Sequence, residues 1–216
     1  NTIRELVKAT GKRMIGWQET ARADIGEGDL FQHWIFLKQS NTDAINSGEK
    51  MKDKPESYRK LMKLYADFMK EASKDPELGI GKGAQVILSP SRYVYMDTPY
   101  AEQSADSTQA AEQARLGMMA YDKQTVAEMY DWDPMTFNPT VEEPTQKVAG
   151  IEAAIWCETV NNFSDLQFLL MPRLAGVAEK GWSQVEKTNW EEYRQRLAGQ
   201  APLLEKVGWN YFKSSL

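Results

Sequence analysis

The amino-acid sequence predicts an α/β fold assembled from parallel strand–helix units, and three observations support this prediction. Short apolar runs alternate with segments of helical periodicity along the chain. No Asn-Gly hairpin turn joins two of these runs. No glycine-rich phosphate loop follows any run, because the stretch Gly79 to Gly83 precedes its strand. The pattern fits either an open α/β sheet or part of a (β/α)8 barrel.

The N-terminal part is expected to form one helix and then two strands. Apolar residues at helical spacing predict a helix over Thr2 to Thr10, which Gly11 would end. The apolar run Arg13 to Trp17 predicts a buried strand, and Leu30 to Phe36 predicts a second one after a polar, glycine-containing stretch. This order of elements agrees with parallel units.

The middle of the chain combines the clearest amphipathic helix with a third strand. From Pro55 to Ala72 the apolar positions follow the i, i+3, i+4, i+7 rule, with Lys and Glu between them. We expect an elongated outer helix there, with partner binding as a minor alternative. The continuous apolar run Ala84 to Ser89 predicts a strand that is buried on both faces.

The second half is expected to carry loops, one more strand and several helices. Residues 98–146 are rich in proline and predict loops with short helices, and Lys147 to Trp156 predicts the fourth strand. The expected helices are Asp165 to Leu169, Pro172 to Trp182, Trp190 to Leu197 and Pro202 to Val207. In the second of these helices Leu174, Ala175, Ala178 and Trp182 are expected to form one packed face.

Composition and charge exclude several classes of function. The 216 residues include 42% hydrophobic and 26% charged residues with a net charge of -5, which describes a globular chain and argues against a nucleic-acid partner. The longest apolar runs are too short to span a membrane, and the single cysteine, Cys157, cannot form an intrachain disulfide. With His33 as the only histidine, a metal site with several histidines is excluded.

Aromatic and carboxylate residues recur where the predicted strands end. The sets are Trp17 with Glu19, Trp34 alone, Tyr95 with Asp97, and Trp156 with Glu158. In parallel α/β folds the chemistry lies at the C-terminal ends of strands. Aromatic faces pack against the C–H patches of a pyranose, and carboxylates accept hydrogen bonds from its hydroxyls. From the residues alone, a carbohydrate site and four independent core and capping positions are equally good interpretations of the pattern.

Four segments resemble glycoside hydrolase family 20, the β-N-acetylhexosaminidases, in order across nearly the whole chain. The segments are Gly16 to Glu19, Ser89 to Ser91 with Tyr95 to Asp97, Gly150 to Glu158, and Met171 to Ser183. The resemblance implies a (β/α)8 TIM-barrel type fold, present as a partial barrel with strands 5 to 8 and their helices. It further implies that residues 1–216 form the C-terminal half of the catalytic barrel, with no second domain.

The resemblance also implies a role for each residue at the strand ends. In that family the 2-acetamido group of the sugar attacks the anomeric carbon and forms an oxazolinium intermediate, the substrate-assisted exception among retaining glycosidases. Tyr95 would be the catalytic residue that donates its hydroxyl to the acetamido oxygen. The implied substrate-binding residues are Trp17, Trp34 and Trp156 as aromatic walls, and Asp97 and Glu158 as acceptors for the sugar hydroxyls. Neither a cofactor nor a metal is expected.

Other residues near these motifs are interpreted as structural. Arg173 is expected to pair with a carboxylate, Glu179 and Trp182 are expected to pack, and His33 is expected to be a strand residue with satisfied hydrogen bonds. The family's general-acid Glu and orienting Asp have no counterpart in this sequence, so we expect them upstream and expect the chain alone to be inactive.

Two alternatives to a hexosaminidase fragment stay open at this point. One is a noncatalytic carbohydrate-binding half-barrel, and the other is an enzyme whose general acid is Glu19, Asp97 or Glu158. The expected partners are an N-acetylhexosamine-containing glycan, the missing N-terminal half of the barrel and, through open sheet edges, a second copy of the chain. No nucleic acid and no membrane is expected as a partner, and an exported or periplasmic location is favoured slightly.

Overall fold

A computed structural model describes residues 2–35, 54–136 and 143–214 of the chain. The chain divides into two compact units, and each is described by itself below. The first unit comprises Asn1–Leu88 with Asn138–Gly150, and the second comprises Ser89–Phe137 with Ile151–Leu216. Among the described residues no helix is both long enough and apolar enough to cross a membrane.

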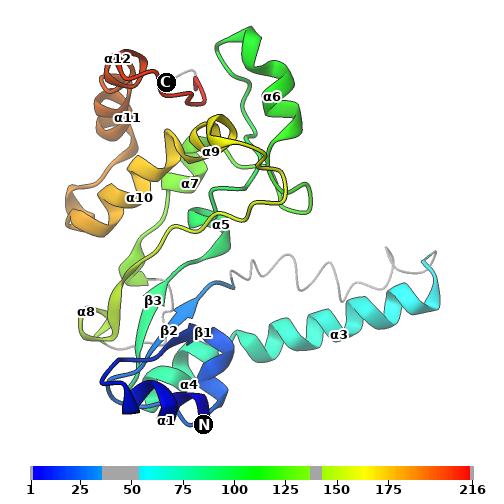
Figure 1. Ribbon diagram of the computed structural model, residues 1–216, viewed down its shortest axis with the longest axis vertical. Coiled ribbons are helices and arrows are strands. Elements are labelled where there is room, and N and C mark those ends of the chain that lie inside the picture. The colour runs from blue at the N-terminus through cyan, green and yellow to red at the C-terminus, as the bar shows by residue number, and fades with distance from the viewer. Residues whose placement is uncertain (1, 36–53, 137–142, 215–216) are drawn as a thin grey trace. The chain divides into compact units, whose positions relative to one another are not determined.

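Four short strands form one sheet, in the order in which they occur along the chain (Figure 1). They are β1 (Ile15–Trp17), β2 (Leu30–His33), β3 (Gln85–Leu88) and β4 (Val148–Ile151). β1 pairs with β2 in parallel, and β2 pairs with β3 in parallel. A doubly wound sheet reverses its strand order at a switch point, whereas a barrel adds strands consecutively. The observed order therefore favours the barrel type over the open sheet.

The strands are shorter and less buried than the sequence predicts. β2 ends at His33, and Phe36 of the predicted strand lies outside the described residues. Ile15 is 54% exposed, so the prediction of a buried first strand is wrong at that position. In β3 only Val86 and Leu88 are fully buried, which gives one covered face instead of the two predicted.

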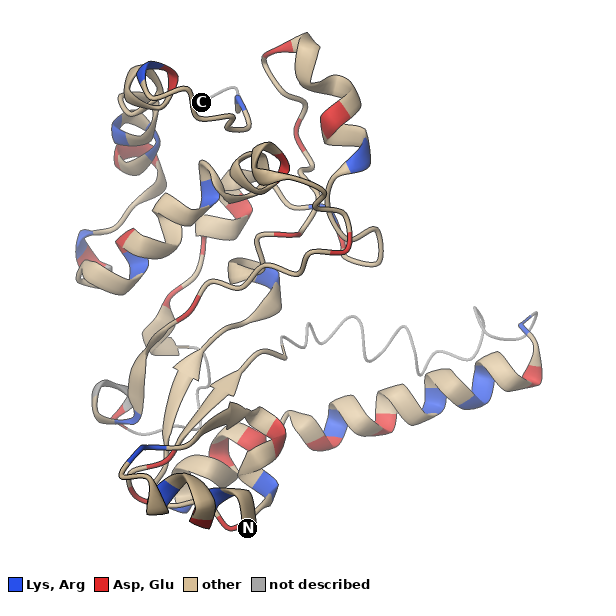
Figure 2. Cartoon of the chain, viewed as in Figure 1, with Lys and Arg blue, Asp and Glu red and all other residues tan. Residues whose placement is uncertain are grey.

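The helices of the first unit are α1 (Thr2–Ala9), the 3-10 helix η1 (Gln18–Arg22), α3 (Glu56–Ala72), α4 (Asp75–Gly81) and α8 (Pro144–Lys147). Two of them, α1 and α3, lie where the sequence predicts them, whereas η1 and α4 were not predicted. α3 buries only Met69 and Ala72, at its C-terminal end, and Leu61 of the predicted apolar face is 62% exposed. Figure 2 shows acidic and basic residues interspersed along α3, which include the i, i+4 pairs of Lys60 with Glu56 and Lys63 with Asp67.

The second unit consists of short helices and loops around an aromatic core. Its elements are α5 (Ser91–Val94), η2 (Ser107–Gln109), α6 (Ala110–Arg115), α7 (Val126–Tyr130), η3 (Pro134–Thr136), α9 (Phe163–Leu170), α10 (Arg173–Trp182), η4 (Val185–Lys187), α11 (Trp190–Ala198) and α12 (Ala201–Lys206). The rings of Tyr100 and Phe212 stack at a centroid distance of 3.7 Å, and Phe168 meets both edge-on. These rings belong to the cluster that packs α9 and α11 together.

Two predictions for the second half need correction. The fourth strand was expected to continue to Trp156, but β4 ends at Ile151 and a single bridge joins Ala154 to Tyr95 further along. Trp182 was expected to pack, but it lies at the end of α10 and is 94% exposed. α10 instead buries Arg173 and Val177, which are four residues apart on one helix face.

Candidate active site

In the second unit, Tyr95 and Trp156 lie on two adjacent extended segments. The Met96 N–H donates to the Ala154 carbonyl at 2.8 Å, and the Ala154 N–H donates to the Val94 carbonyl at 3.0 Å. This pairing holds the Tyr95 and Trp156 rings edge to face, with centroids 5.8 Å apart. Burial raises the pKa of the Tyr95 phenol, so its hydroxyl keeps its proton and can donate a hydrogen bond.

Asp97, two residues beyond Tyr95, carries a buried carboxylate. Its side chain is 1% exposed, and neither oxygen has a partner of good geometry in the described part of the chain. Burial raises the pKa of Asp97 to about 6, the negative charge of Glu158 adds to the shift, and backbone N–H groups and Arg173 oppose it. A buried acceptor left unpaired is costly, so this carboxylate is suited to accept hydrogen bonds from a ligand.

Arg173, at the start of α10, fixes the backbone on both sides of Asp97. One Nη group donates to the Met96 carbonyl and the other to the Thr98 carbonyl, each at 2.7 Å. The guanidinium also lies 3.8 Å from the centroid of the Tyr100 ring. The structural interpretation of Arg173 is confirmed, but its partners are backbone carbonyls and not the expected carboxylate.

A glycine turn supports the same segment from outside. The Met118 N–H donates to the Asp97 carbonyl at 2.7 Å. Gly117, just before it, has a φ of 101°, and a Cβ there would lie 2.8 Å from the backbone of Pro99. Only glycine fits this turn, so Gly117 belongs to the residues that hold Asp97 in place and that the sequence patterns did not reveal.

Trp156 and Glu158 are the exposed members of this group. The Trp156 indole is 38% exposed, so part of its surface is available to a ligand. Glu158 is exposed as well, and its charge reaches Asp97. The two segments thus bring Tyr95, Asp97, Trp156 and Glu158 to one place, as the sequence predicts.

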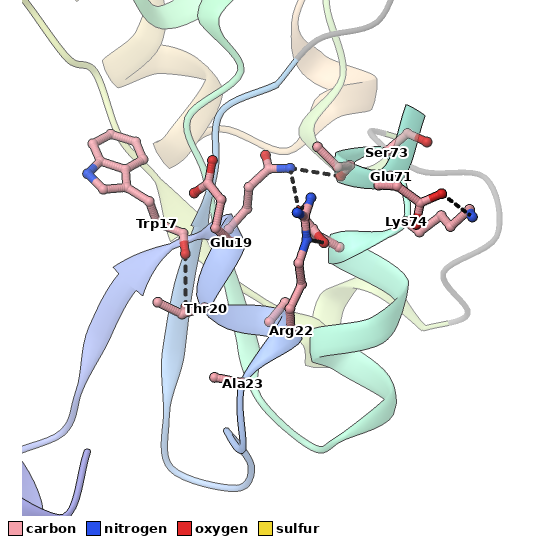
Figure 3. A network of polar contacts seen from close by, with 12 residues as sticks. Trp17, Glu19, Thr20, Arg22, Ala23, Glu71, Ser73 and Lys74 are labelled. Carbon is pink, nitrogen blue, oxygen red and sulfur yellow. Dashed lines mark hydrogen bonds and ion pairs between the residues drawn. The ribbon is translucent and has the colours of Figure 1, made fainter. Parts of the chain in front are cut away.

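The first unit carries the other two predicted residues, Trp17 and Trp34. Trp17 is the last residue of β1, and its carbonyl accepts a hydrogen bond from the Thr20 hydroxyl at 2.9 Å (Figure 3). Gly16 leaves the room for this turn, because a Cβ there would lie 2.4 Å from the Thr20 methyl carbon. Trp34 follows β2, and its indole N–H donates to Glu19 at 3.2 Å.

The network around these residues includes Gln18, Arg22 and Asp75, which the sequence analysis did not single out. Asp75 is buried and accepts two hydrogen bonds from Arg22, at 2.7 and 2.9 Å. Gln18 is completely buried and contacts His33, Trp34 and Ile35 as well as Asp75. In the sequence, Gln18 is a polar residue directly after an apolar run. Such a position is typical of a solvated turn, so the sequence alone does not reveal its burial.

The described residues form no metal-binding cluster. Within residues 2–35, 54–136 and 143–214 no three His, Cys, Asp or Glu side chains gather in a way that could hold a metal ion. The sole cysteine, Cys157, is exposed. The functional groups that the two units present are aromatic rings, a tyrosine hydroxyl and carboxylates.

A sheet whose strands follow one another in sequence order is typical of an α/β protein of the barrel type, and in that class ligands bind beyond the C-terminal ends of the strands. A sequence model described as glycosyl hydrolase family 20, catalytic domain, matches residues 1–185. The chain belongs to this family, and the resemblance seen in its motifs is confirmed.

Relatives and solved structures agree with this assignment. The chain is 29% identical over 209 residues to a beta-N-acetylhexosaminidase of Cellulomonas fimi, which covers 97% of this chain and 33% of that protein. The GH20 beta-N-acetylhexosaminidase of Streptomyces coelicolor A3(2) superposes with a TM-score of 0.69 at 30% identity, over 99% of this chain and 35% of that one. A mutant Streptomyces plicatus beta-hexosaminidase in complex with product (GlcNAc) gives 0.71 at 29% identity, over 99% and 34%. The chain thus spans about a third of the length of these proteins.

Proposed function

We propose that the polypeptide carrying this chain is a β-N-acetylhexosaminidase, which removes terminal nonreducing N-acetylhexosamine residues from glycans with retention of configuration. The 2-acetamido group of the substrate serves as the nucleophile. The family match and the named relatives support this reaction class. The four strands then correspond to strands 5 to 8 of the (β/α)8 barrel, and the general-acid Glu with its neighbouring Asp lies on another part of the barrel.

The observation that carries the proposal is the unpartnered Asp97 carboxylate beside the Tyr95 and Trp156 rings. Asp97 accepts hydrogen bonds from sugar hydroxyls, and Glu158 does the same from a more exposed position. Trp156 packs against the sugar, and the protonated Tyr95 hydroxyl donates to the acetamido oxygen as charge develops there. Trp17 and Trp34 are assigned to the walls around the acetamido group, a role that stays a prediction.

The proposal is tested by removing the Tyr95 hydroxyl from the active polypeptide. Because this hydroxyl stabilises charge that forms in the transition state, we expect Tyr95→Phe to lower kcat on a chromogenic N-acetylglucosaminide by roughly 100-fold, with little change in KM. Tyr193→Phe is the matched control, since Tyr193 is equally buried and its hydroxyl has no hydrogen-bond partner in the described part of the chain. An unchanged kcat for Tyr95→Phe would contradict the assignment of Tyr95.

The two alternatives are separated by a second measurement. If the general acid lies outside this chain, the purified 216 residues bind N-acetylglucosamine but do not hydrolyse the chromogenic substrate. Turnover by the chain alone would place the acid at Glu19, Asp97 or Glu158. Binding without turnover in the longest natural polypeptide would instead favour the noncatalytic carbohydrate-binding half-barrel.

A further inference from the structure

The side chain of Gln18 joins three parts of the first unit. Its Nε2 donates to the Ala72 carbonyl, the last residue of α3, at 2.8 Å and to Asp75 at 3.3 Å. Its Oε1 lies 3.1 Å from the Trp34 N–H and 3.0 Å from the Ile35 N–H, both of which donate to it. The residue is fully buried, so none of these bonds is replaced by water when it is lost.

These partners determine the orientation of the amide and the protonation of His33. An oxygen must face two backbone N–H groups, and an NH2 group must face a carbonyl, so the Gln18 amide cannot be flipped. The Nδ1 atom of His33 lies 3.0 Å from the same Oε1. Because that oxygen only accepts, Nδ1 must carry a proton. Burial lowers the pKa of His33 to about 4, so the ring is neutral near pH 7 and adopts the Nδ1–H tautomer.

A second set of contacts holds the amide itself in place. Asp75 receives Gln18 on one side and the Arg22 guanidinium on the other, and Arg22 also lies over the Phe68 ring at 5.6 Å. Figure 3 shows Glu19 and Arg22, both residues of η1, with Ser73 and Lys74 opposite them. The amide is therefore fixed by the junction of α3 and α4, and it fixes the backbone beyond β2 in turn.

We propose that Gln18 is a positioning residue for Trp34: its amide oxygen holds the Trp34 and Ile35 backbone, while Glu19 holds the Trp34 indole N–H. The proposal rests on the function proposed above, in which Trp34 is one wall of the acetamido site. Gln18 and Glu19, the first two residues of η1, thereby set the place and the rotation of an aromatic ring that directly follows β2. An aromatic wall restricts the acetamido group to the attacking conformer only if its own position is fixed.

The first test follows the backbone and the imidazole by NMR. In the unmodified chain we expect the single His33 to show a protonated Nδ1 and an unprotonated Nε2 at neutral pH. Gln18→Met removes the acceptor, so the amides of Trp34 and Ile35 should exchange at least about 10-fold faster and the His33 tautomer should shift. Gln18→Glu keeps an acceptor oxygen for the two amides and His33, but its second oxygen would face the Ala72 carbonyl and Asp75. It should therefore restore the Nδ1 proton and only part of the amide protection.

Val86→Ala is the matched control for general loss of stability, because Val86 is fully buried in the same unit and makes no polar contact with Trp34. It should leave the His33 tautomer unchanged. An Nε2–H tautomer in the unmodified chain would overturn the proposal, even if Gln18→Met fails to fold. Equal amide exchange in Gln18→Met and the unmodified chain would overturn it too.

The second test measures N-acetylglucosamine binding and keeps the two proposals apart. We expect Gln18→Met to weaken binding by roughly 10-fold and Gln18→Glu to recover part of that loss. If Trp34→Ala binds the sugar as well as the unmodified chain does, the proposed role of Trp34 fails while the NMR result still stands on its own. If Trp34→Ala loses binding and Gln18→Met retains it, the positioning role fails.

Discussion

Each unit contains one buried polar side chain that fixes the backbone next to proposed site residues, but the two units treat the site residue itself differently. Gln18 uses its oxygen and both amide protons, and the Trp34 indole it supports is itself bonded to Glu19. Arg173 holds the carbonyls on both sides of Asp97, yet the Asp97 carboxylate has no hydrogen-bond partner in the described part of the chain.

The contrast separates buried polar groups whose hydrogen bonds stabilise the fold from a buried carboxylate whose proposed partners are the hydroxyls of a ligand. A satisfied buried network contributes to stability and loses it when one member is removed. An unsatisfied buried carboxylate costs stability in the free protein, and the cost is recovered when a ligand supplies donors. Substitutions in the two classes should therefore have opposite effects on folding and on binding.

The largest effect is expected from removing the guanidinium of Arg173. Arg173→Met would leave the carbonyls of Met96, Thr98 and Leu169 without this donor in a buried region, which should lower the free energy of unfolding by about 4 kcal/mol. Urea unfolding followed by circular dichroism measures it. Arg196→Met serves as the matched control, because its ion pair with Glu179 is largely exposed on the Arg side and should be worth less than about 1 kcal/mol. If the two variants lose the same free energy of unfolding, the Arg173 contacts do not stabilise the fold more than an exposed ion pair does.

The next largest effects are expected from Asp97→Asn, which should change stability and sugar binding in opposite directions. Asp97→Asn removes a charge that burial disfavours, so the free energy of unfolding at pH 7 should rise by about 1 to 3 kcal/mol. Sugar affinity should fall by roughly 100-fold, because charge-assisted bonds to two hydroxyls are lost. Isothermal titration with N-acetylglucosamine and urea unfolding measure the two quantities on the same sample.

The pH dependence provides the control for this variant. The folded pKa of Asp97 is raised to about 6 from the usual value near 4, so its destabilising contribution is absent at pH 4 and develops as the pH rises through 6. Asp97→Asn and the unmodified chain should therefore unfold alike near pH 4 and differ at pH 7. If the variant is destabilised at pH 7, the carboxylate belongs to the scaffold and the contrast between the units is broken.

The sequence predicts the placement of the site better than its support. Periodicity and strand-end residues locate β1, β2, α3 and the segments of Tyr95 and Trp156, because these signals are local. The contacts of Gln18 reach Ala72 and Asp75, which are 54 and 57 residues away, and no local pattern reveals them. The contacts of Arg173 with the Met96 and Thr98 carbonyls, 77 and 75 residues away, likewise have no local pattern.

The wrong predictions for Trp182 and Arg173 also concern tertiary contacts, which local sequence patterns do not determine. The helical spacing of Pro172 to Trp182 places Trp182 on an apolar face, but whether another element covers the last turn is a tertiary question, and the structure leaves it exposed. For Arg173 the expectation of a carboxylate partner follows from charge alone. In the structure the backbone carbonyls of Met96 and Thr98, in a buried region, accept its hydrogen bonds instead.

The smallest expected effect concerns His33 and distinguishes the units by the sign of their pH dependence. Its folded pKa is lowered to about 4 from 6.5, mainly by burial, so its contribution to stability is complete above pH 6.5 and is lost as the pH falls toward 4. Over part of the same interval Asp97 becomes protonated and the second unit gains stability. His33→Gln keeps a donor for Gln18 without a titrating ring, and relative to it the unmodified chain should lose about 2 kcal/mol between pH 7 and pH 4. Hydrogen exchange resolved by residue should assign that loss to the first unit, and an identical slope in both proteins would mean that His33 does not require its neutral form.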